Sequence, residues 1–193
     1  MIKDTLLKLI DGKHLTQQEA TASTEEIMRA EATPSQIASF LTALKMNGET
    51  VDEIAGMAMA MRSLMLKVET GIPEIFDTCG TGGDGKGTFN ISTVTAFVAA
   101  AAGLTVAKHG NRASSSKCGS ADILEALGVK IDAPTNSMVR ALKQIGIAFF
   151  FAPLYHPAMK NAAPIRKEIG FRTVLVQRKM DKSKSITSCG LVN

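Results

Sequence analysis

Two polar, glycine-rich segments carry the residues whose types and spacing could do chemistry. The first reads DTCGTGGDGKGTFNIST over residues 77–93, and the second reads KHGNRASSSKCGSAD over residues 108–122. In the first, five glycines between positions 80 and 87 allow tight turns that leave backbone amides accessible. A helix is expected to begin near Ser92, where its first unpaired amides and positive dipole end favour an anion. This segment predicts a phosphate site, although it has neither P-loop nor dinucleotide-fingerprint spacing.

The second segment adds cations and hydroxyls to this picture. Lys108, Arg112 and Lys117 accompany the serines of residues 114–116, and a further helix start is expected at Ser120. Cations and hydroxyls beside a helix N-terminus favour a multiply charged anion. For each segment the alternative is structural, a tight turn for the first and a solvated loop with capping serines for the second. Together they suit one extended ligand with phosphates at both ends.

Other reactive side chains in these segments leave alternatives open. Asp84 could cap backbone amides or engage hydroxyls and a metal, and His109 could be a general base or a local hydrogen-bonding group. Cys79 is interpreted as a small buried residue rather than a nucleophile. The sequence shows no Ser/His/Asp order and no catalytic carboxylate pair. This pattern favours chemistry in which the protein holds and polarises its substrate.

The first seventy residues are expected to be helical. Besides a helix over residues 2–10, three capping boxes, TQQE, TPSQ and TVDE, place a threonine three residues before a carboxylate or amide, at Thr16, Thr33 and Thr50. Gly48 is a candidate C-terminal cap. The four-residue spacing of Met57, Met61 and Met65 predicts one packed helix face.

From Pro73 onward, strand and helix patterns alternate. The helical patterns lie between short β-rich runs, which are EIFDT, LTVAKH, GVKI, IAFFFA and FRTVLV. Such alternation predicts right-handed crossovers and a mostly parallel sheet, with a ligand at the strand ends. The expected fold class is α/β, an N-terminal all-helical domain followed by an incomplete parallel-sheet domain.

Composition and charge exclude several function classes. The chain has 193 residues, 45% hydrophobic and 21% charged, which is typical of globular proteins. No signal peptide or membrane span is recognisable, so we expect a cytoplasmic protein without a membrane partner. The net charge of +4 is concentrated in residues 160–193, and the chain has one tyrosine and no tryptophan, so we expect no nucleic-acid partner. Three cysteines without metal-type spacing indicate free thiols.

The ordered set GTGGD, TFNIST, KHGNRASSSKCGSAD and FFFAPLYHPAMKNAAPIRKEIGFRT closely resembles the anthranilate phosphoribosyltransferase family over residues 1–174. The resemblance implies transfer of phosphoribosyl from phosphoribosyl pyrophosphate to the amine of anthranilate, with Mg²⁺ and release of pyrophosphate. It also implies a homodimer formed through the helical domain. Family behaviour adds an anthranilate synthase amidotransferase as a candidate partner.

The resemblance also implies roles for individual residues. Lys108 is the leading candidate for electrostatic stabilisation, Ser92 is also the magnesium ligand, and Asn111 and Arg166 face anthranilate. The pyrophosphate side would be held by Gly80, Gly83, Asp84, Thr88, Asn90, Ile91, Ser92 and Thr93. The ribose and its phosphates would be wrapped by Lys108, His109, Gly110, Asn111, Arg112, Ala113, Ser114, Ser115, Ser116 and Ser120.

After about residue 174 the resemblance stops. The family continues with further strands and an acidic Asp-Glu pair that binds magnesium, whereas this chain reads LVQRKMDKSKSITSCGLVN. We expect a truncated member with a helical domain over 1–70, a substrate-binding α/β domain over 73–174 and a divergent basic tail over 175–193. Turnover is expected to be impaired. The alternatives are a non-catalytic binding or oligomerisation remnant and a protein like pyrimidine nucleoside phosphorylase.

Overall fold

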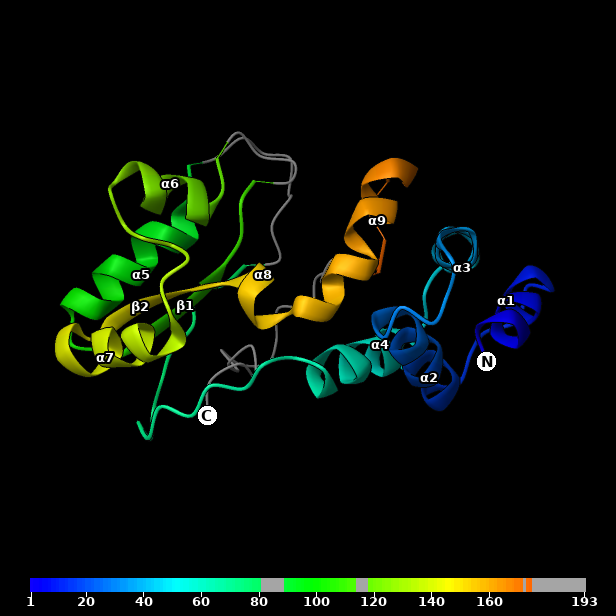
Figure 1. The fold of residues 1–193 in the computed structure, drawn as a ribbon, viewed down its shortest axis with the longest axis horizontal. Helices are drawn as coiled ribbons and strands as arrows, with labels where there is room; N and C mark the ends of the chain where they lie inside the picture. The colour runs from blue at the N-terminus through cyan, green and yellow to red at the C-terminus, as the bar shows by residue number, and fades with distance from the viewer. Residues whose placement is uncertain (81–88, 114–117, 172, 175–193) are drawn as a thin grey trace. The chain divides into compact units, whose positions relative to one another are not determined.

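The computed structural model describes residues 1–80, 89–113, 118–171 and 173–174 (Figure 1). The chain divides into two compact units. The first unit comprises Met1–Met65 and the segment that begins at His156, and the second comprises Leu66–Tyr155. The division expected from the sequence, into 1–70, 73–174 and a tail, stays a prediction; the chain joins the first unit again at His156.

The first unit is helical and begins its helices where the sequence predicts. The three expected capping boxes are confirmed. The hydroxyls of Thr16, Thr33 and Thr50 each accept from the backbone amide three residues on, and the threonine's own backbone amide donates to that residue's side chain. Gly48 ends a helix with φ of 76°. The elements are α1 (Ile2–Ile10), α2 (Gln17–Met28), α3 (Pro34–Asn47), α4 (Val51–Ser63), the short 3₁₀ helix η1 (Pro157–Asn161) and α9 (Ala163–Ile169).

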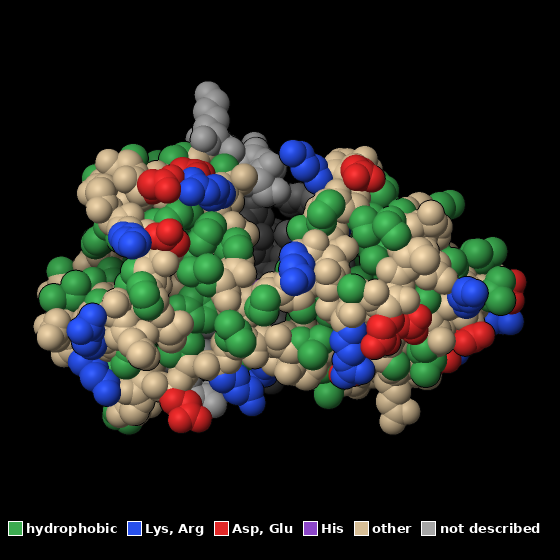
Figure 2. Space-filling view, viewed as in Figure 1, with side chains coloured by type: hydrophobic (Ala, Val, Ile, Leu, Met, Phe, Trp, Pro, Cys, Tyr) green, Lys and Arg blue, Asp and Glu red, His purple; other side chains and the backbone are tan. Residues whose placement is uncertain are grey.

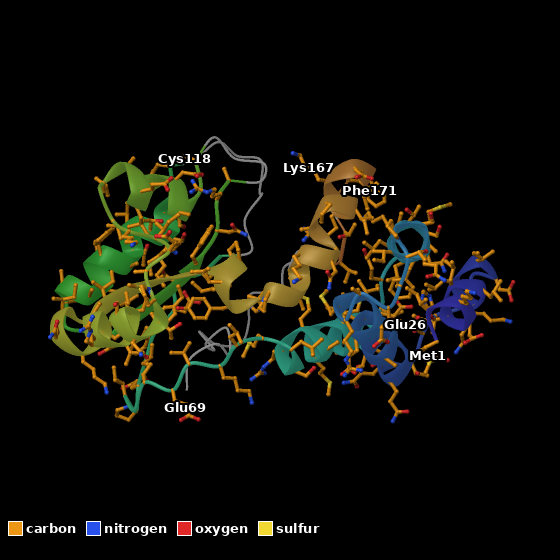
Figure 3. The ribbon with its side chains drawn as sticks, viewed as in Figure 1. Met1, Glu26, Glu69, Cys118, Lys167 and Phe171 are labelled. Carbon is orange, nitrogen blue, oxygen red and sulfur yellow. The ribbon has the colours of Figure 1, made fainter. Side chains whose placement is uncertain are left out.

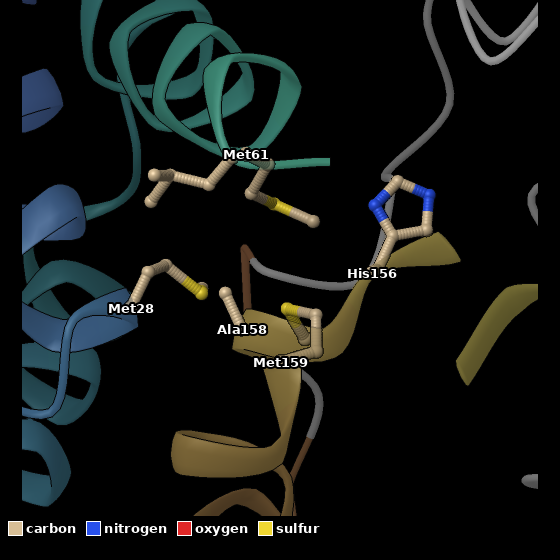
Figure 4. Close-up of a pocket in the computed structure, with 6 residues that line it drawn as sticks. Met28, Met61, His156, Ala158 and Met159 are labelled. Atoms are coloured by element: carbon tan, nitrogen blue, oxygen red, sulfur yellow. The ribbon is translucent and has the colours of Figure 1, made fainter. Parts of the chain in front are cut away.

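The core of the first unit lies between these helices. Ile27 and Phe40 are fully buried. Met57 and Met61 face the same cluster, as their spacing predicts, whereas Met65 lies beyond the end of the helix. The side-chain amide of Asn161 donates to the backbone carbonyl of Met28 at 2.7 Å, and this bond connects η1 to α2. A small hollow beside this bond is lined by Met28, Met61, Leu64, His156, Ala158 and Met159 (Figure 4).

Charges at the start of the chain add to this packing. The Glu26 carboxylate accepts from the Ile2 amide at 2.9 Å and lies 3.5 Å from the Met1 amino group (Figure 3). On the face drawn in Figure 2, lysines and arginines are interspersed with acidic side chains. Among the described residues, no helix combines the length and apolar character needed to cross a membrane.

The second unit is a small parallel sheet with helices packed on it. Strands β1 (Val106–Gly110) and β2 (Ile147–Phe151) pair in parallel, with Val106 opposite Ile147, and Phe76 adds a parallel bridge to Val106 on the other side of β1. The helices are α5 (Ile91–Ala101), α6 (Ser120–Ala126), α7 (Thr135–Ile145) and α8 (Ala152–Tyr155). The expected fold class is confirmed, with an incomplete sheet.

Two expected strands do not form. EIFDT, over residues 74–78, contributes only the isolated bridge at Phe76, and GVKI, over residues 128–131, is wrong. The Val129 amide donates to the Leu124 carbonyl at 2.9 Å, so this backbone closes the end of α6 instead of joining a sheet. Ile131 is buried with Leu124 and Phe149, which accounts for the apolar character of the run. Of the last expected strand, FRTVLV, Thr173 and Val174 lie outside any strand, and the part beyond them lies outside the described residues.

Candidate active site

Three segments of the second unit meet at one edge of the sheet. Phe76 pairs with β1 through two backbone bonds, from its amide to the Thr105 carbonyl and from the Ala107 amide to its own carbonyl, both 2.9 Å. Because this pairing is parallel, the residues after Phe76 and the end of β1 lie at the same edge. The start of α5 is held there as well, since the Thr78 hydroxyl donates to the Ser92 carbonyl at 2.7 Å.

Lys108 is the central charge of this edge. It lies in β1 and is only 3% exposed, and its ammonium is 3.2 Å from the Ser92 hydroxyl and 3.5 Å from the Thr78 hydroxyl. Burial lowers the pKa of Lys108, and the neighbouring Cys79 and Asp77 oppose that shift. The arrangement therefore presents a partly desolvated ammonium between two hydroxyls, which is suited to a phosphate group.

The start of α5 is capped by the protein itself. Oδ1 of Asn90 accepts three hydrogen bonds. Thr93 donates two of them, from its backbone amide at 3.1 Å and from its hydroxyl at 2.9 Å, and the Ser92 hydroxyl donates the third at 3.0 Å. The Ile91 amide donates to the Phe89 carbonyl at 2.7 Å. Fewer first-turn amides are thus available to an anion than the sequence predicts. The hydroxyl of Ser92, through its contact with Lys108, becomes the main polar group of this turn.

Asn90 also links the two glycine-rich segments. Its Nδ2 lies 3.5 Å from the Cys118 carbonyl and 3.5 Å from the Ser120 hydroxyl, at the start of α6. The helix start predicted at Ser120 is confirmed. Cys79 is a free cysteine, as expected, but it is exposed rather than buried. Partial desolvation of the thiol and the neighbouring Asp77 carboxylate raise the pKa of Cys79, which disfavours the thiolate.

Arg112 is engaged by acidic residues of α6 rather than open to an anion. Its guanidinium contacts Asp122 at 3.2 Å and both oxygens of Glu125 at 2.8 and 3.0 Å, and it lies 5.9 Å from the ring centroid of Phe151. These hydrogen bonds raise the pKa of Arg112 and lower that of Glu125. Asp122 also accepts from the Ala113 amide at 2.9 Å, so the acidic pair fixes this part of the loop.

The remaining residues of the second segment are placed by backbone packing. A Cβ at Gly110 would lie 2.8 Å from the Phe149 ring and 3.1 Å from Ser120 Cβ, so the packing of this ring and of the start of α6 leaves little room for a side chain there. Asn111 accepts from the Ala121 amide at 3.2 Å through its carbonyl. The amide of His109 donates to an Asp77 oxygen at 3.1 Å. These contacts order the chain from β1 toward α6.

The other expected site residues fall into two groups. Arg166 belongs to α9 in the first unit, where burial lowers its pKa, and its assignment to anthranilate stays a prediction. Gly80 lies at the end of the described part of the first segment. The residues that lie outside the described part are Gly83, Asp84, Thr88, Ser114, Ser115 and Ser116.

The described residues do not by themselves fit a magnesium ion. Mg²⁺ prefers carboxylates, phosphates and water in an octahedron, whereas Ser92 offers one hydroxyl that is 3.2 Å from an ammonium. Among described residues, Asp77, Cys79 and His109 have ligand atoms within 4.8 Å of one another. This mixed sulfur and nitrogen set suits softer ions, and Asp77 already accepts from two backbone amides. The magnesium role of Ser92 stays a prediction.

Sequence reasoning missed two residues of this edge, Asp77 and Thr78. Thr78 contacts both Lys108 and Ser92, and Asp77 accepts from the Cys79 and His109 amides. Their position directly after a β-rich run and before the glycines was the available signal, because polar residues at the ends of parallel strands face the ligand edge.

Comparison with known proteins places both units in one family. The model of the glycosyl transferase family helical bundle domain matches residues 3–65, and that of the glycosyl transferase family a/b domain matches residues 72–176. Similar curated proteins include the anthranilate phosphoribosyltransferases of Moorella thermoacetica, 56% identical over 173 residues, and of Chloroflexus aurantiacus, 58% identical over 173 residues. The alignments cover 90% of this chain and 51% of each relative. The chain thus spans about half the length of the curated relatives it matches.

Solved structures agree with this placement. Anthranilate phosphoribosyltransferase from Thermus thermophilus is 47% identical with a TM-score of 0.81, covering 89% of this chain and 52% of that one. The Saccharomyces cerevisiae enzyme in complex with PRPP and Mg is 29% identical with a TM-score of 0.80, covering 90% of this chain and 52% of that one. The resemblance inferred from the sequence motifs is confirmed. The chain belongs to the glycosyl transferase family that joins this helical bundle domain to this α/β domain.

Proposed function

We propose that this chain binds phosphoribosyl pyrophosphate at the edge of β1 and acts in the transfer of its phosphoribosyl group to the amine of anthranilate. The observation that carries the proposal is the buried ammonium of Lys108 between the hydroxyls of Ser92 and Thr78. A buried cation beside a helix start and two hydroxyls is suited to a ligand rich in phosphate oxygens. The Saccharomyces cerevisiae relative was solved with PRPP and Mg, and also with 4-fluoroanthranilate, which supports the same substrate classes here.

The chemistry follows from the charges that develop in the reaction. The bond between the ribose carbon and the pyrophosphate oxygen breaks, the anthranilate nitrogen bonds to that carbon, and the nitrogen loses a proton. Negative charge grows on the departing pyrophosphate. Lys108 would stabilise this charge, because a desolvated ammonium interacts more strongly than one in water. Ser92 and Thr78 orient the ammonium, and Asn90 fixes the turn that carries Ser92.

Several finer assignments belong to the proposal. Mg²⁺ would enter with the pyrophosphate substrate, which supplies the oxygens that the described residues lack. Arg166 would recognise the anthranilate carboxylate, since a guanidinium fork matches a carboxylate. The proposal also includes a homodimer formed through the helical unit and a cytoplasmic location. The amidotransferase partner rests on family behaviour.

An anthranilate consumption assay tests the proposal. The purified chain is mixed with Mg²⁺, phosphoribosyl pyrophosphate and anthranilate, and the loss of anthranilate fluorescence is followed. We expect consumption that Lys108→Ala abolishes and that Lys143→Ala, an exposed lysine of α7, leaves unchanged. Binding that Lys108→Ala weakens, without consumption by any variant, would favour the alternative of a non-catalytic binding protein. Phosphorolysis of a pyrimidine nucleoside would favour the remaining alternative, a protein like pyrimidine nucleoside phosphorylase.

A further inference from the structure

The pairing between Phe76 and β1 stops after one bridge, and a side chain takes over from the backbone. On this side of β1 the amides that point toward Phe76 are those of alternate residues, Ala107 and then His109. Ala107 donates to the Phe76 carbonyl at 2.9 Å. In a continued parallel ladder, His109 would donate to the carbonyl of Thr78. It donates instead to Oδ1 of Asp77 at 3.1 Å.

The same carboxylate oxygen also holds the start of the first glycine-rich segment. Oδ1 of Asp77 accepts from the Cys79 amide at 2.9 Å, two residues further on. One oxygen therefore links Cys79, at the start of the first segment, to His109 near the end of β1. His109 directly follows Lys108 in the chain. Because the Thr78 carbonyl is not needed in the ladder, the chain can leave the sheet at this point.

We propose that Asp77 is a positioning residue, whose carboxylate oxygen replaces the missing ladder acceptor and holds Cys79, at the start of the first glycine-rich segment, beside the end of β1 that carries Lys108. This inference rests on the proposed function for its catalytic consequence. Its structural part, the two hydrogen bonds that the Cys79 and His109 amides donate to Asp77, does not depend on that function. The role requires an acceptor oxygen and does not require a negative charge, so Asp77→Asn can retain it whereas Asp77→Ala cannot.

The test compares Asp77→Ala and Asp77→Asn with the wild-type chain and with Asp132→Ala, an exposed control in the second unit. We expect Asp77→Ala to raise KM for phosphoribosyl pyrophosphate about tenfold, because Cys79 is no longer held beside β1. Its melting temperature should fall by a few degrees relative to the control, because the Cys79 and His109 amides lose their acceptor. Asp77→Asn should recover most of this loss. Amide hydrogen exchange of Cys79 and His109 should accelerate in the alanine variant and not in the asparagine variant.

The outcomes separate this inference from the proposed function. Equal losses in both variants would overturn positioning by hydrogen bonds, because they would show that the charge is what matters. Unchanged KM and unchanged exchange in Asp77→Ala would overturn it too. If the wild-type chain consumes no anthranilate, the proposed function fails, and the exchange rates alone decide whether Asp77 orders the two amides.

Discussion

Removing the Lys108 ammonium tests the central electrostatic claim, and Lys108→Met is the sharpest perturbation. Methionine keeps an unbranched apolar stem of similar length and removes the charge that lies 3.2 Å from the Ser92 hydroxyl. At about 4 Å, an ammonium and one phosphate charge interact by about 4 kcal/mol when the effective dielectric constant is about 20. In the variant, water can solvate the phosphate and recover part of this interaction. We therefore expect a loss of about 2 to 4 kcal/mol, which weakens binding about 30-fold to 700-fold.

The folded state should respond in the opposite sense. Burial lowers the pKa of Lys108 from 10.5, so the ionised lysine is less favourable in the folded chain than in the unfolded one. Its favourable contribution to stability is present above pH 10.5 and is lost as the pH falls through the folded pKa. Near neutral pH, Lys108→Met therefore removes an unfavourable term. We expect an unchanged or higher melting temperature together with weaker binding.

Isothermal titration with phosphoribosyl pyrophosphate, beside a thermal melt, measures both effects. Lys143→Met on α7 is the matched control, because it removes an exposed lysine of the same unit. Wild-type affinity should also fall as the pH rises toward 10.5, at a lower pH than the titration of an exposed lysine. A Lys108→Met variant that melts normally and binds within twofold of the control would refute the reasoning.

Three further substitutions test the surrounding structure. Gly119→Ala would place a Cβ against the Ala113 amide nitrogen, so we expect a loss of about 1 to 3 kcal/mol in unfolding free energy, measured by urea titration, and weaker substrate binding. Asn90→Ala removes the cap on Thr93 and should cost about 1 kcal/mol of stability and also weaken binding, which titration would report. Thr33→Ala should cost about 1 kcal/mol through the lost capping box while leaving the affinity per folded chain unchanged, since its contacts lie in the first unit.

Local signals explain how much of the fold the sequence could predict. A capping box is complete within four residues, so Thr16, Thr33 and Thr50 mark helix starts without reference to the rest of the chain. The alternation of apolar runs and helices likewise predicts a parallel sheet. GVKI fails because a run of four residues cannot distinguish a strand from packing at a helix end, and here Ile131 joins the core from beyond α6.

The site was harder to predict because its partners are distant in the sequence. Residue types placed Lys108 and Ser92 correctly in one region, since both flank glycine-rich segments. The pairing of Arg112 with Glu125 depends on the way α6 folds back, which the loop composition does not reveal. The role of Asp77 depends on where a ladder stops, and that point becomes visible only when Phe76 is seen beside β1.

The directions of the pKa shifts distinguish two kinds of charge in the second unit. Hydrogen bonds raise the pKa of Arg112 and lower the pKa values of Asp122 and Glu125. Each shift favours the charged form, so ionisation of these groups stabilises the fold. Burial moves the pKa values of Lys108 and Asp77 toward their neutral forms, so their ionisation opposes folding. Stability alone would favour neutral residues at these two positions. A charge that the fold keeps against its own stability is best explained by a ligand, which for Lys108 is the phosphate of the proposed substrate. At Asp77 the acceptor oxygen, and not the charge, serves to hold the chain beside that lysine.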